Sequence, residues 1–143
     1  MSKISAFRGE HRWLSNFHLV EVKLDGLPYP STEHAYQAAK TLDIAERLMI
    51  QALPTCGQAK RTGQRLKLRD DWEQVKVSIM LDLQRQKYTV PCLRDKLLAT
   101  GAAELIEGNT WGDCFWGVCG DVGLNWLGRL LMQVREEIKA VRP

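Results

Sequence analysis

The segment from residue 124 to residue 141 constrains the fold of this chain most strongly. Its apolar residues recur at intervals of three and four, so they fall on one face of a helix. This stripe consists of Leu127, Leu130, Leu131, Val134, Ile138 and Val141. A helix with one apolar face is typical of a globular core, and 143 residues suit one such core. We therefore expect one domain over residues 1–143.

Turn signals divide the rest of the chain. Residues 18–30 alternate between apolar and polar side chains on either side of Asp25 and Gly26, a dipeptide that favours a tight β-hairpin turn. Ser31 or Thr32 then predicts a helix start. Further helices are indicated over 43–53, over 55–66 with Gly63 as a stop, over 71–88 and, after a Thr89 cap, up to about 100, with a short strand over 103–108. The expected fold class is mainly α with a small β-hairpin element (α+β), with Ala35, Ala38, Ala39 and Leu42 on the buried side of the helix that follows the hairpin.

The composition is that of a globular protein, with 45% hydrophobic and 26% charged residues. No apolar run approaches the length of a membrane helix, and the first residues lack the apolar core of a signal peptide. We expect a cytoplasmic protein without a membrane partner. The four cysteines and three histidines do not follow zinc-ligand spacing. Free buried thiols, no metal and no cofactor are the expectation.

The stretch "STEHAYQAAK", residues 31–40, gathers Glu33, Tyr36, Gln37 and Lys40 on one helical stripe. Glu33 and Lys40 would lie two turns apart, roughly 10 Å along the axis, which leaves room for a small ligand. A first-turn glutamate is favoured in its ionised form by the helix dipole, which suits a general base or a cation stabiliser. The same residues also fit an ordinary helix start followed by a solvated lysine.

The stretch "NTWGDCFWGVCGDVGLNWLG", residues 109–128, combines aromatic residues with glycines in no helical or strand period. Flat aromatic rings can stack on a nucleobase, and glycines permit sharp turns or close approach to a ligand. A loop that fills the core with tryptophans explains the pattern equally well. The candidate binding groups here are Asn109, Trp111, Asp113, Trp116, Gly117 and Asn125.

Two other segments carry possible phosphate contacts. Residues 7–17 interleave Arg8, Ser15 and Asn16 with aromatic residues, a set suited to phosphate or ribose unless it is only an anchored polar loop. Residues 60–69 hold five basic residues and no acid, which indicates either a solvated face or a phosphate-binding patch. The net charge of +3 is compatible with an anionic ligand without requiring one.

Taken in order, these pieces resemble the NADAR family, also called YbiA-like. The match rests on an F-x-G segment, an L-S-N-F segment, a T-E-H-x-[FY]-Q-x-x-K helix and a W-G ending with G-x-N-x-L-G-x-x-L-M-x-V-R. In this chain they are Phe7, Arg8 and Gly9; Leu14 to Phe17; Thr32 to Lys40; and Trp116 to Arg135. The resemblance covers nearly the whole chain and implies a single YbiA-like domain.

The resemblance implies a hydrolase that cleaves N-glycosidic bonds to ribose, and the spacing of the cysteines and histidines leads us to expect no metal in it. It assigns catalytic roles to Glu33 and Lys40, with Asp113 as a second carboxylate. Lys40 would either orient phosphate or ribose hydroxyls or attack C1′ of an opened ribose. The implied substrate-binding residues are Arg8, Gly9, Ser15, Asn16, Phe17, Tyr36, Gln37, Asn109, Trp111, Trp116, Gly117 and Asn125.

Two substrate classes go with the family: ADP-ribose on guanine in nucleic acid, and a phosphoribosylamino-pyrimidine of the riboflavin pathway. The first implies de-ADP-ribosylation of DNA or RNA and a toxin-type ADP-ribosyltransferase on a separate chain. The loop over 109–128 varies within the family, so the substrate does not follow from the fold. A non-catalytic module that binds ADP-ribose remains the rival, although it would not need Glu33.

Overall fold

The structure is a computed structural model that describes residues 2–141 of the chain. The chain divides into two compact units. One is the continuous segment Asn16–Lys87, and the other joins the residues up to Ser15 with the chain from Tyr88 onward. Within residues 2–141 no helix has both the length and the apolar character that crossing a membrane requires.

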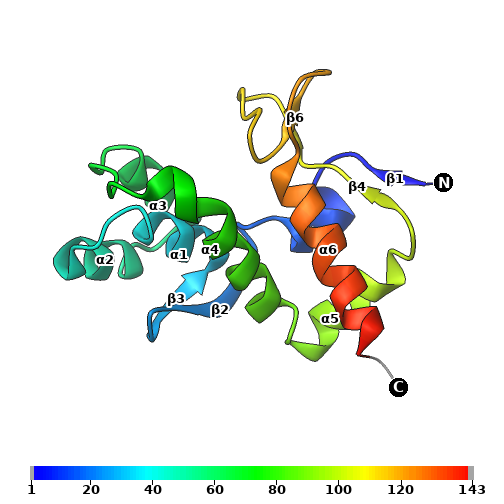
Figure 1. Cartoon of the computed structure of the whole chain (residues 1–143), viewed down its shortest axis with the longest axis horizontal. Coiled ribbons are helices and arrows are strands. Elements are labelled where there is room, and N and C mark those ends of the chain that lie inside the picture. Colours follow the sequence, from blue (N-terminus) through cyan, green and yellow to red (C-terminus); the bar gives the residue numbers. More distant parts are fainter. Residues whose placement is uncertain (1, 142–143) are drawn as a thin grey trace. The chain divides into compact units, whose positions relative to one another are not determined.

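The unit Asn16–Lys87 is built around a short central helix, α1, as Figure 1 shows. This helix packs against the β-hairpin and against each of the three other helices of the unit. All of its residues are buried. Its polar side chains therefore do not form a solvent-exposed face of the helix. The elements are β2 (Leu19–Leu24), β3 (Leu27–Ser31), α1 (Thr32–Ala38), α2 (Ile44–Gln51), α3 (Cys56–Gly63) and α4 (Trp72–Lys87).

The β-hairpin forms where the sequence predicts it. β2 and β3 are antiparallel, with Leu24 opposite Leu27 across the turn. Asp25 and Gly26 both have positive φ, 49° and 84°, as a two-residue type I′ turn requires. The last strand residue, Ser31, is also the N-cap of α1, where its hydroxyl accepts a hydrogen bond from the backbone of His34. The hairpin therefore leads directly into the central helix.

The second unit pairs its helices with very short strands. β1 runs parallel to β4, with Ile4 opposite Leu105, and β5 runs parallel to β6. The stripe of α6 packs on α5 and β4, and its residues from Leu127 to Val134 are buried. The elements are β1 (Lys3–Ile4), η1 (Gly9–Leu14), α5 (Pro91–Ala99), β4 (Glu104–Leu105), β5 (Gly108–Asn109), β6 (Val118–Cys119) and α6 (Trp126–Ala140). Together the two units confirm the α+β class.

Several local expectations are wrong. α1 ends at Ala38, so Lys40 lies in the turn after the helix rather than on the helix two turns beyond Glu33. Leu42 is consequently 63% exposed instead of buried. Helix α5 begins at Pro91, so Val90 and not Thr89 holds the N-cap position, and no side chain caps the helix there; proline is favoured at the first helical position. All four cysteines are free, but only Cys56 is buried.

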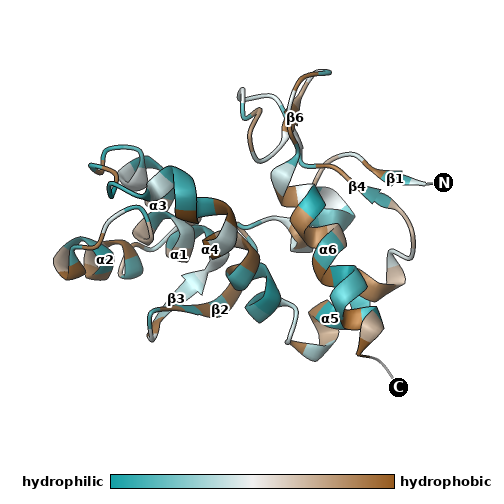
Figure 2. Ribbon diagram, in the orientation of Figure 1, coloured by the Kyte–Doolittle hydropathy of each residue, from teal (hydrophilic) through white to brown (hydrophobic). Residues whose placement is uncertain are grey.

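Apolar residues on α2 face outward. Figure 2 shows hydrophobic colour along this helix, and its large exposed side chains are Ile44, Leu48 and Met49. The helix is held instead through its buried Ile50 and through Arg47, whose side chain is only 3% exposed. A buried arginine needs partners, and those partners lie at the turn after α1 and at the hairpin turn.

Candidate active site

The start of α1 is locked by a buried polar cluster. The hydroxyl of Ser31 lies 2.6 Å from Nδ1 of His34, while Nε2 of that ring lies 3.0 Å from the carbonyl of Leu53. A carbonyl only accepts, so Nε2 donates and Nδ1 accepts from Ser31. The thiol of Cys56 donates to the same hydroxyl at 3.3 Å. His34 thus ties the segment just after α2 to the first turn of α1, and Ser31 ties the start of α3 to it.

Glu33 lies in that first turn and is 7% exposed. Its backbone N–H donates to the carbonyl of Asn16 at 3.1 Å, and its Oε2 accepts from Nε2 of Gln37 at 2.6 Å. The carboxylate is therefore held at a fixed place in a largely dry environment. A buried, oriented carboxylate of this kind can stabilise a developing positive charge or take a proton from water.

Gln37 is the residue that holds the Glu33 carboxylate, and α3 fixes Gln37 in turn. α3 ends at Gly63, as the sequence predicts. This glycine has a second role that the sequence did not indicate, since a Cβ on it would stand 2.6 Å from Cδ of Gln37. Only glycine therefore allows the amide to fill this space. Oε1 of Gln37 has no hydrogen-bond partner within the part of the chain that the structure describes.

Lys40 follows α1 and is half-buried. Its Nζ lies 5.6 Å from the ring centroid of Tyr36, and that ring packs against Trp72 with centroids 5.3 Å apart. Burial lowers the pKa of the Lys40 amine. The charge of Glu33 opposes this shift, and the charges of Lys60 and Lys76 add to it. Glu33 and Lys40 therefore share one electrostatic environment, although α1 is shorter than expected.

Asp113 and Asn109 organise the aromatic loop of the other unit. Oδ1 of Asp113 accepts from the backbone N–H groups of Phe115 and Trp116 at 3.1 and 2.9 Å. The Asn109 amide donates to the carbonyl of Asp113 at 2.8 Å and accepts its N–H at 3.0 Å. In the structure both side chains shape the loop backbone, a role that sequence reasoning did not assign to them.

The glycines of this loop serve mainly to let the chain pack on itself. A Cβ at Gly117 would stand 2.7 Å from the Asn109 amide nitrogen, and one at Gly123 equally close to Cα of Val118. Asn125 has positive φ, 53°, and its amide bridges the N–H of Glu107 and the carbonyl of Leu105. These positions fold the loop onto the start of α6.

The aromatic side chains of the loop differ in exposure. Trp111 is 61% exposed, which leaves ring surface for stacking. Trp116 is half-buried and meets Phe115 edge-on, with centroids 4.8 Å apart. Phe115 in turn stacks over Trp126 at 6.4 Å. The loop therefore fills part of its own unit with rings and also presents one tryptophan to solvent.

The N-terminal candidates have different environments. Arg8 and Gly9 are exposed at the start of η1, while Ser15 and Phe17 are half-buried. Asn16 is buried, and its amide oxygen accepts from Gln84 at 2.7 Å while its amide nitrogen contacts the sulfur of Met80. The Asn16 carbonyl also accepts from the backbone N–H of Glu33. Asn16 therefore links Glu33 to α4.

The structure brings Glu33, Tyr36, Gln37 and Lys40 together within one unit. The loop candidates Trp111, Asp113 and Trp116 belong to the other unit, and their place beside this set stays a prediction. Residues 2–141 contain no group of three or more histidine, cysteine or acidic side chains that could hold a metal ion.

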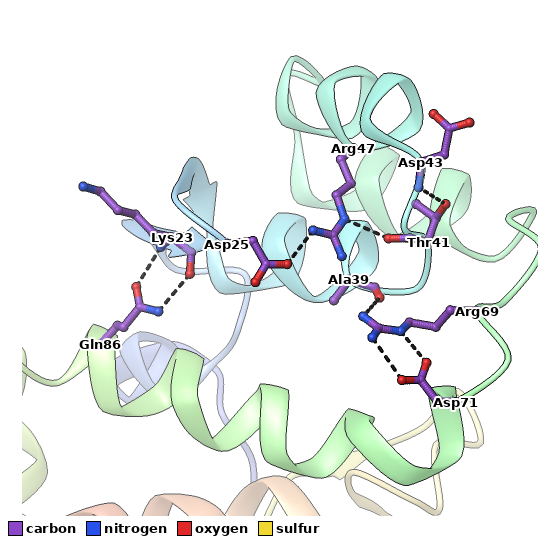
Figure 3. A network of polar contacts seen from close by, with 9 residues as sticks. All are labelled: Lys23, Asp25, Ala39, Thr41, Asp43, Arg47, Arg69, Asp71 and Gln86. Carbon is purple, nitrogen blue, oxygen red and sulfur yellow. Dashed lines mark hydrogen bonds and ion pairs between the residues drawn. The ribbon is translucent and has the colours of Figure 1, made fainter.

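Sequence reasoning missed the role of two arginines beside Lys40, drawn in Figure 3. Nε of Arg47 donates to the carbonyl of Thr41 at 2.7 Å. The backbone N–H of Arg69 donates to the carbonyl of Lys40, also at 2.7 Å. In the sequence Arg69 is simply the last residue of the basic run over 60–69. The only signal that sets it apart is the pair of acids that follows, Asp70 and Asp71, and the sequence does not show which of them pairs with it.

The chain belongs to the NADAR family, since its residues 6–139 match the NADAR domain. This match extends over residues of both units. The fold agrees: the NMR structure of the Escherichia coli protein YbiA superposes with a TM-score of 0.85 at 34% identity, covering 98% of this chain and 88% of that one.

Curated relatives carry two kinds of name. The N-glycosidase YbiA of Escherichia coli is 41% identical over 128 residues, which cover 87% of this chain and 79% of that protein. A riboflavin biosynthesis protein of Vibrio vulnificus is 38% identical over 138 residues, or 93% of this chain. The match spans only 37% of the length of the Vibrio protein.

Proposed function

We propose that this chain is an N-glycosidase that breaks a C1′–N bond to ribose. The observation that carries the proposal is the buried Glu33 carboxylate, oriented by Gln37, in the same electrostatic environment as a lysine of lowered pKa. Relatives named N-glycosidase support the same activity. A buried carboxylate beside a desolvated amine is a combination that a fold does not need for stability.

Glu33 acts on the charge that develops at C1′. As the C1′–N bond lengthens, the ribose ring gains positive charge, and a nearby carboxylate stabilises it. The same carboxylate can then accept a proton from the attacking water. The Nε2 donor of Gln37 keeps this carboxylate in place during the reaction.

Lys40 supplies the nucleophile in the covalent form of this mechanism. When the ring opens, O4′ takes a proton and C1′ becomes an imine carbon joined to the base nitrogen. The neutral Lys40 amine adds to C1′, its two protons pass to the base nitrogen, the base leaves as a neutral amine, and a lysine imine remains. Water hydrolyses that imine and restores the amine. Burial of Lys40 favours its neutral form, which this step needs.

The substrate that we favour is ADP-ribose attached to guanine in nucleic acid. The residues Arg61, Arg65 and Lys67 are exposed at the end of α3 and just beyond it, and they offer phosphate contacts beyond a single nucleotide. Lys60 and Lys76 add positive charge around Lys40 itself. The exposed ring of Trp111 is the proposed stacking surface for a base, and Trp116 would stack beside it. Arg8, which is exposed, is the proposed phosphate contact.

The second candidate substrate is a phosphoribosylamino-pyrimidine. The names of the Vibrio vulnificus and Zea mays relatives, both riboflavin biosynthesis proteins, favour it. It contains the same C1′–N bond and one phosphate, so Glu33 and Lys40 would act unchanged. Only the extended basic surface would be without a ligand.

The deciding experiment offers the purified protein three substrates side by side: ADP-ribosyl-guanine DNA, ADP-ribosyl-thymidine DNA and the ribosylamino-pyrimidine phosphate. Release of ADP-ribose from guanine alone is the expected result. Cleavage of the pyrimidine alone supports the second candidate. A protein that binds ADP-ribose but cleaves none of the three is a binding module, and the proposal fails.

A further inference from the structure

The turn after α1 contains backbone carbonyls that need hydrogen-bond donors from outside the helix. Because α1 ends at Ala38, the carbonyls that follow have no helical N–H to accept from. Three successive carbonyls, those of Ala39, Lys40 and Thr41, are all taken by two arginine residues. Figure 3 shows both arginine side chains directed at this turn.

Arg69 contacts two of the three carbonyls. Its backbone N–H donates to the carbonyl of Lys40 at 2.7 Å, and its Nη1 lies 3.5 Å from the carbonyl of Ala39. The rest of the guanidinium forms a two-pronged pair with Asp71, with Nε–Oδ1 at 2.6 Å and Nη2–Oδ2 at 3.1 Å. Such bidentate pairs fix orientation as well as position. Asp71 thus aims Arg69 at the turn.

Arg47 takes the third carbonyl and is held from the opposite side. Its Nε donates to the carbonyl of Thr41 at 2.7 Å, and its Nη1 pairs with Asp25 in the hairpin turn at 2.7 Å. Only 3% of the Arg47 side chain is exposed, whereas Asp25 is 71% exposed. The turn is therefore tied to the hairpin through α2 and to the segment before α4 through Arg69.

We propose that Arg47 and Arg69 are positioning residues that hold the backbone of Lys40, so that its amine stays over Tyr36 and near Glu33. This inference rests on the catalytic role proposed for Lys40. Neither arginine needs to touch the substrate. Each acts through a carbonyl at or next to residue 40, at the base of the lysine side chain.

The physical reason is the flexibility of lysine. Its four-carbon side chain rotates freely, so a loose backbone would let the amine reach solvent. With the backbone held, the amine faces Glu33 on α1, Lys60 on α3 and Lys76 on α4, and Lys76 is also paired with Glu73 at 2.9 Å. A displacement of about 1 Å at a reacting group can cost as much as about a hundredfold in rate.

The test weakens each support without touching Lys40. Arg69→Met keeps the stem and the backbone N–H but removes the guanidinium. Asp25→Gly releases Arg47, and glycine suits the positive φ of 49° at this position. We expect each change to lower kcat by about ten- to a hundredfold while KM changes little. Asp25→Asn, which retains an acceptor for Arg47, should recover most of the kcat.

The matched control removes an arginine elsewhere. Arg94 on α5 pairs with Asp95 at 3.6 Å and is 43% exposed, so Arg94→Met should leave kcat and the Lys40 amine unchanged. If Arg94→Met lowered kcat as much as Arg69→Met does, the proposal would be overturned. The loss would then come from removing any arginine and not from releasing the turn at Lys40.

A second readout needs no turnover. In protein labelled on its lysine side chains, the NMR signal of the Lys40 amine, identified by its absence in Lys40→Arg, is followed through a pH titration. Loosening the turn returns the amine to water, so in Arg69→Met and Asp25→Gly its pKa should rise toward the ordinary lysine value. An unchanged Lys40 pKa in both folded variants overturns the proposal.

The two proposals fail separately. If no substrate is cleaved, the N-glycosidase function falls, but the Lys40 titration still decides whether the arginines position the amine. Circular dichroism shows whether each variant folds. Should the two variants unfold, Arg69→Lys replaces them, because it keeps the charge but cannot form the two-pronged pair with Asp71, and its titration is then decisive.

Discussion

At the scale of single residues, the proposed site depends on side chains that are buried and oriented rather than on unusual residue types. Glu33 is held by the carbonyl of Asn16 and the amide of Gln37. Lys40 is held at its backbone and lies over Tyr36. Because different neighbours fix the two groups, each can be altered without moving the other.

Glu33→Gln tests the carboxylate. The amide keeps the shape and can still accept from Gln37, so we expect the fold and the ligand affinity to persist. The negative charge and the proton acceptor are removed, so turnover should fall by at least about 10²–10⁴-fold. Glu21→Gln, on an exposed residue of β2, is the control. Near-normal turnover of Glu33→Gln would remove Glu33 from the catalytic role.

Lys40→Ala tests the covalent route. Borohydride reduces an imine to a stable amine, so treatment during turnover should trap a substrate adduct on the parent protein. Mass spectrometry should find the adduct in the exposed-site control Lys96→Ala and none in Lys40→Ala. An adduct that persists in Lys40→Ala would exclude this lysine as the nucleophile and leave it the role of binding phosphate or ribose.

The pH dependence of turnover follows from the lowered pKa of Lys40. In the proposed covalent route only the neutral amine attacks, so turnover by that route should rise with pH up to the pKa of Lys40 and then level off. Since burial lowers that pKa, the plateau should begin below the pH at which an ordinary lysine loses its proton. Measurements of the turnover rate as a function of pH check where the plateau begins. Turnover that falls as the Lys40 amine loses its proton would contradict attack by the neutral amine.

At the scale of elements, α1 is fixed by its neighbours more than by its own length. With Thr32–Ala38 it has about two turns, too few to be stable alone in water. The hairpin, α2, α3 and α4 surround it. The packing of α1 against α3 depends on a glycine, Gly63, that lies against Gln37.

Gly63→Ala tests this packing. The added methyl group collides with Gln37, so the amide that holds Glu33 has to move. We expect a decrease of about 1–3 kcal/mol in the free energy of unfolding together with lower kcat. Gly57→Ala in the same helix is the control: its Cβ would meet only ordinary neighbours, the nearest at 3.5 Å. That change should leave stability equal or slightly higher. Equal effects of the two changes in denaturant titrations would contradict the packing role.

At the scale of the whole molecule, the family match covers residues 6–139 and so extends over both compact units. The expected single domain, like the cytoplasmic location, stays a prediction. The proposed substrate makes the contribution of the basic surface residues to binding testable. Binding to nucleic acid releases counterions in proportion to the number of phosphates that the protein neutralises, so the affinity depends on salt.

Neutralising Arg61, Arg65 and Lys67 together tests the substrate. On ADP-ribosyl-guanine DNA the triple variant should bind more weakly, and the slope of log affinity against log salt should become shallower by about one for each phosphate that the variant no longer neutralises. Activity on a mononucleotide substrate should change little. A slope identical to that of the parent protein would favour the small metabolite.

What the sequence determined by itself is local: the turn at Asp25–Gly26, a helix start at Ser31 or Thr32, the stripe of α6 and the family motifs. Each depends on neighbouring residues, so a pattern of a few positions is enough to predict it. Tertiary structure decided how the turn after α1 is held. Arg47 and Arg69 donate to its carbonyls from positions 7 and 29 residues beyond Lys40, so no local sequence pattern predicts these contacts. It also decided that Gly63 packs on Gln37, and that the carbonyl of Asn16 and the carboxylate of Glu33 belong to one arrangement. Burial, and with it the lowered pKa of Lys40, arises only when distant elements exclude water together.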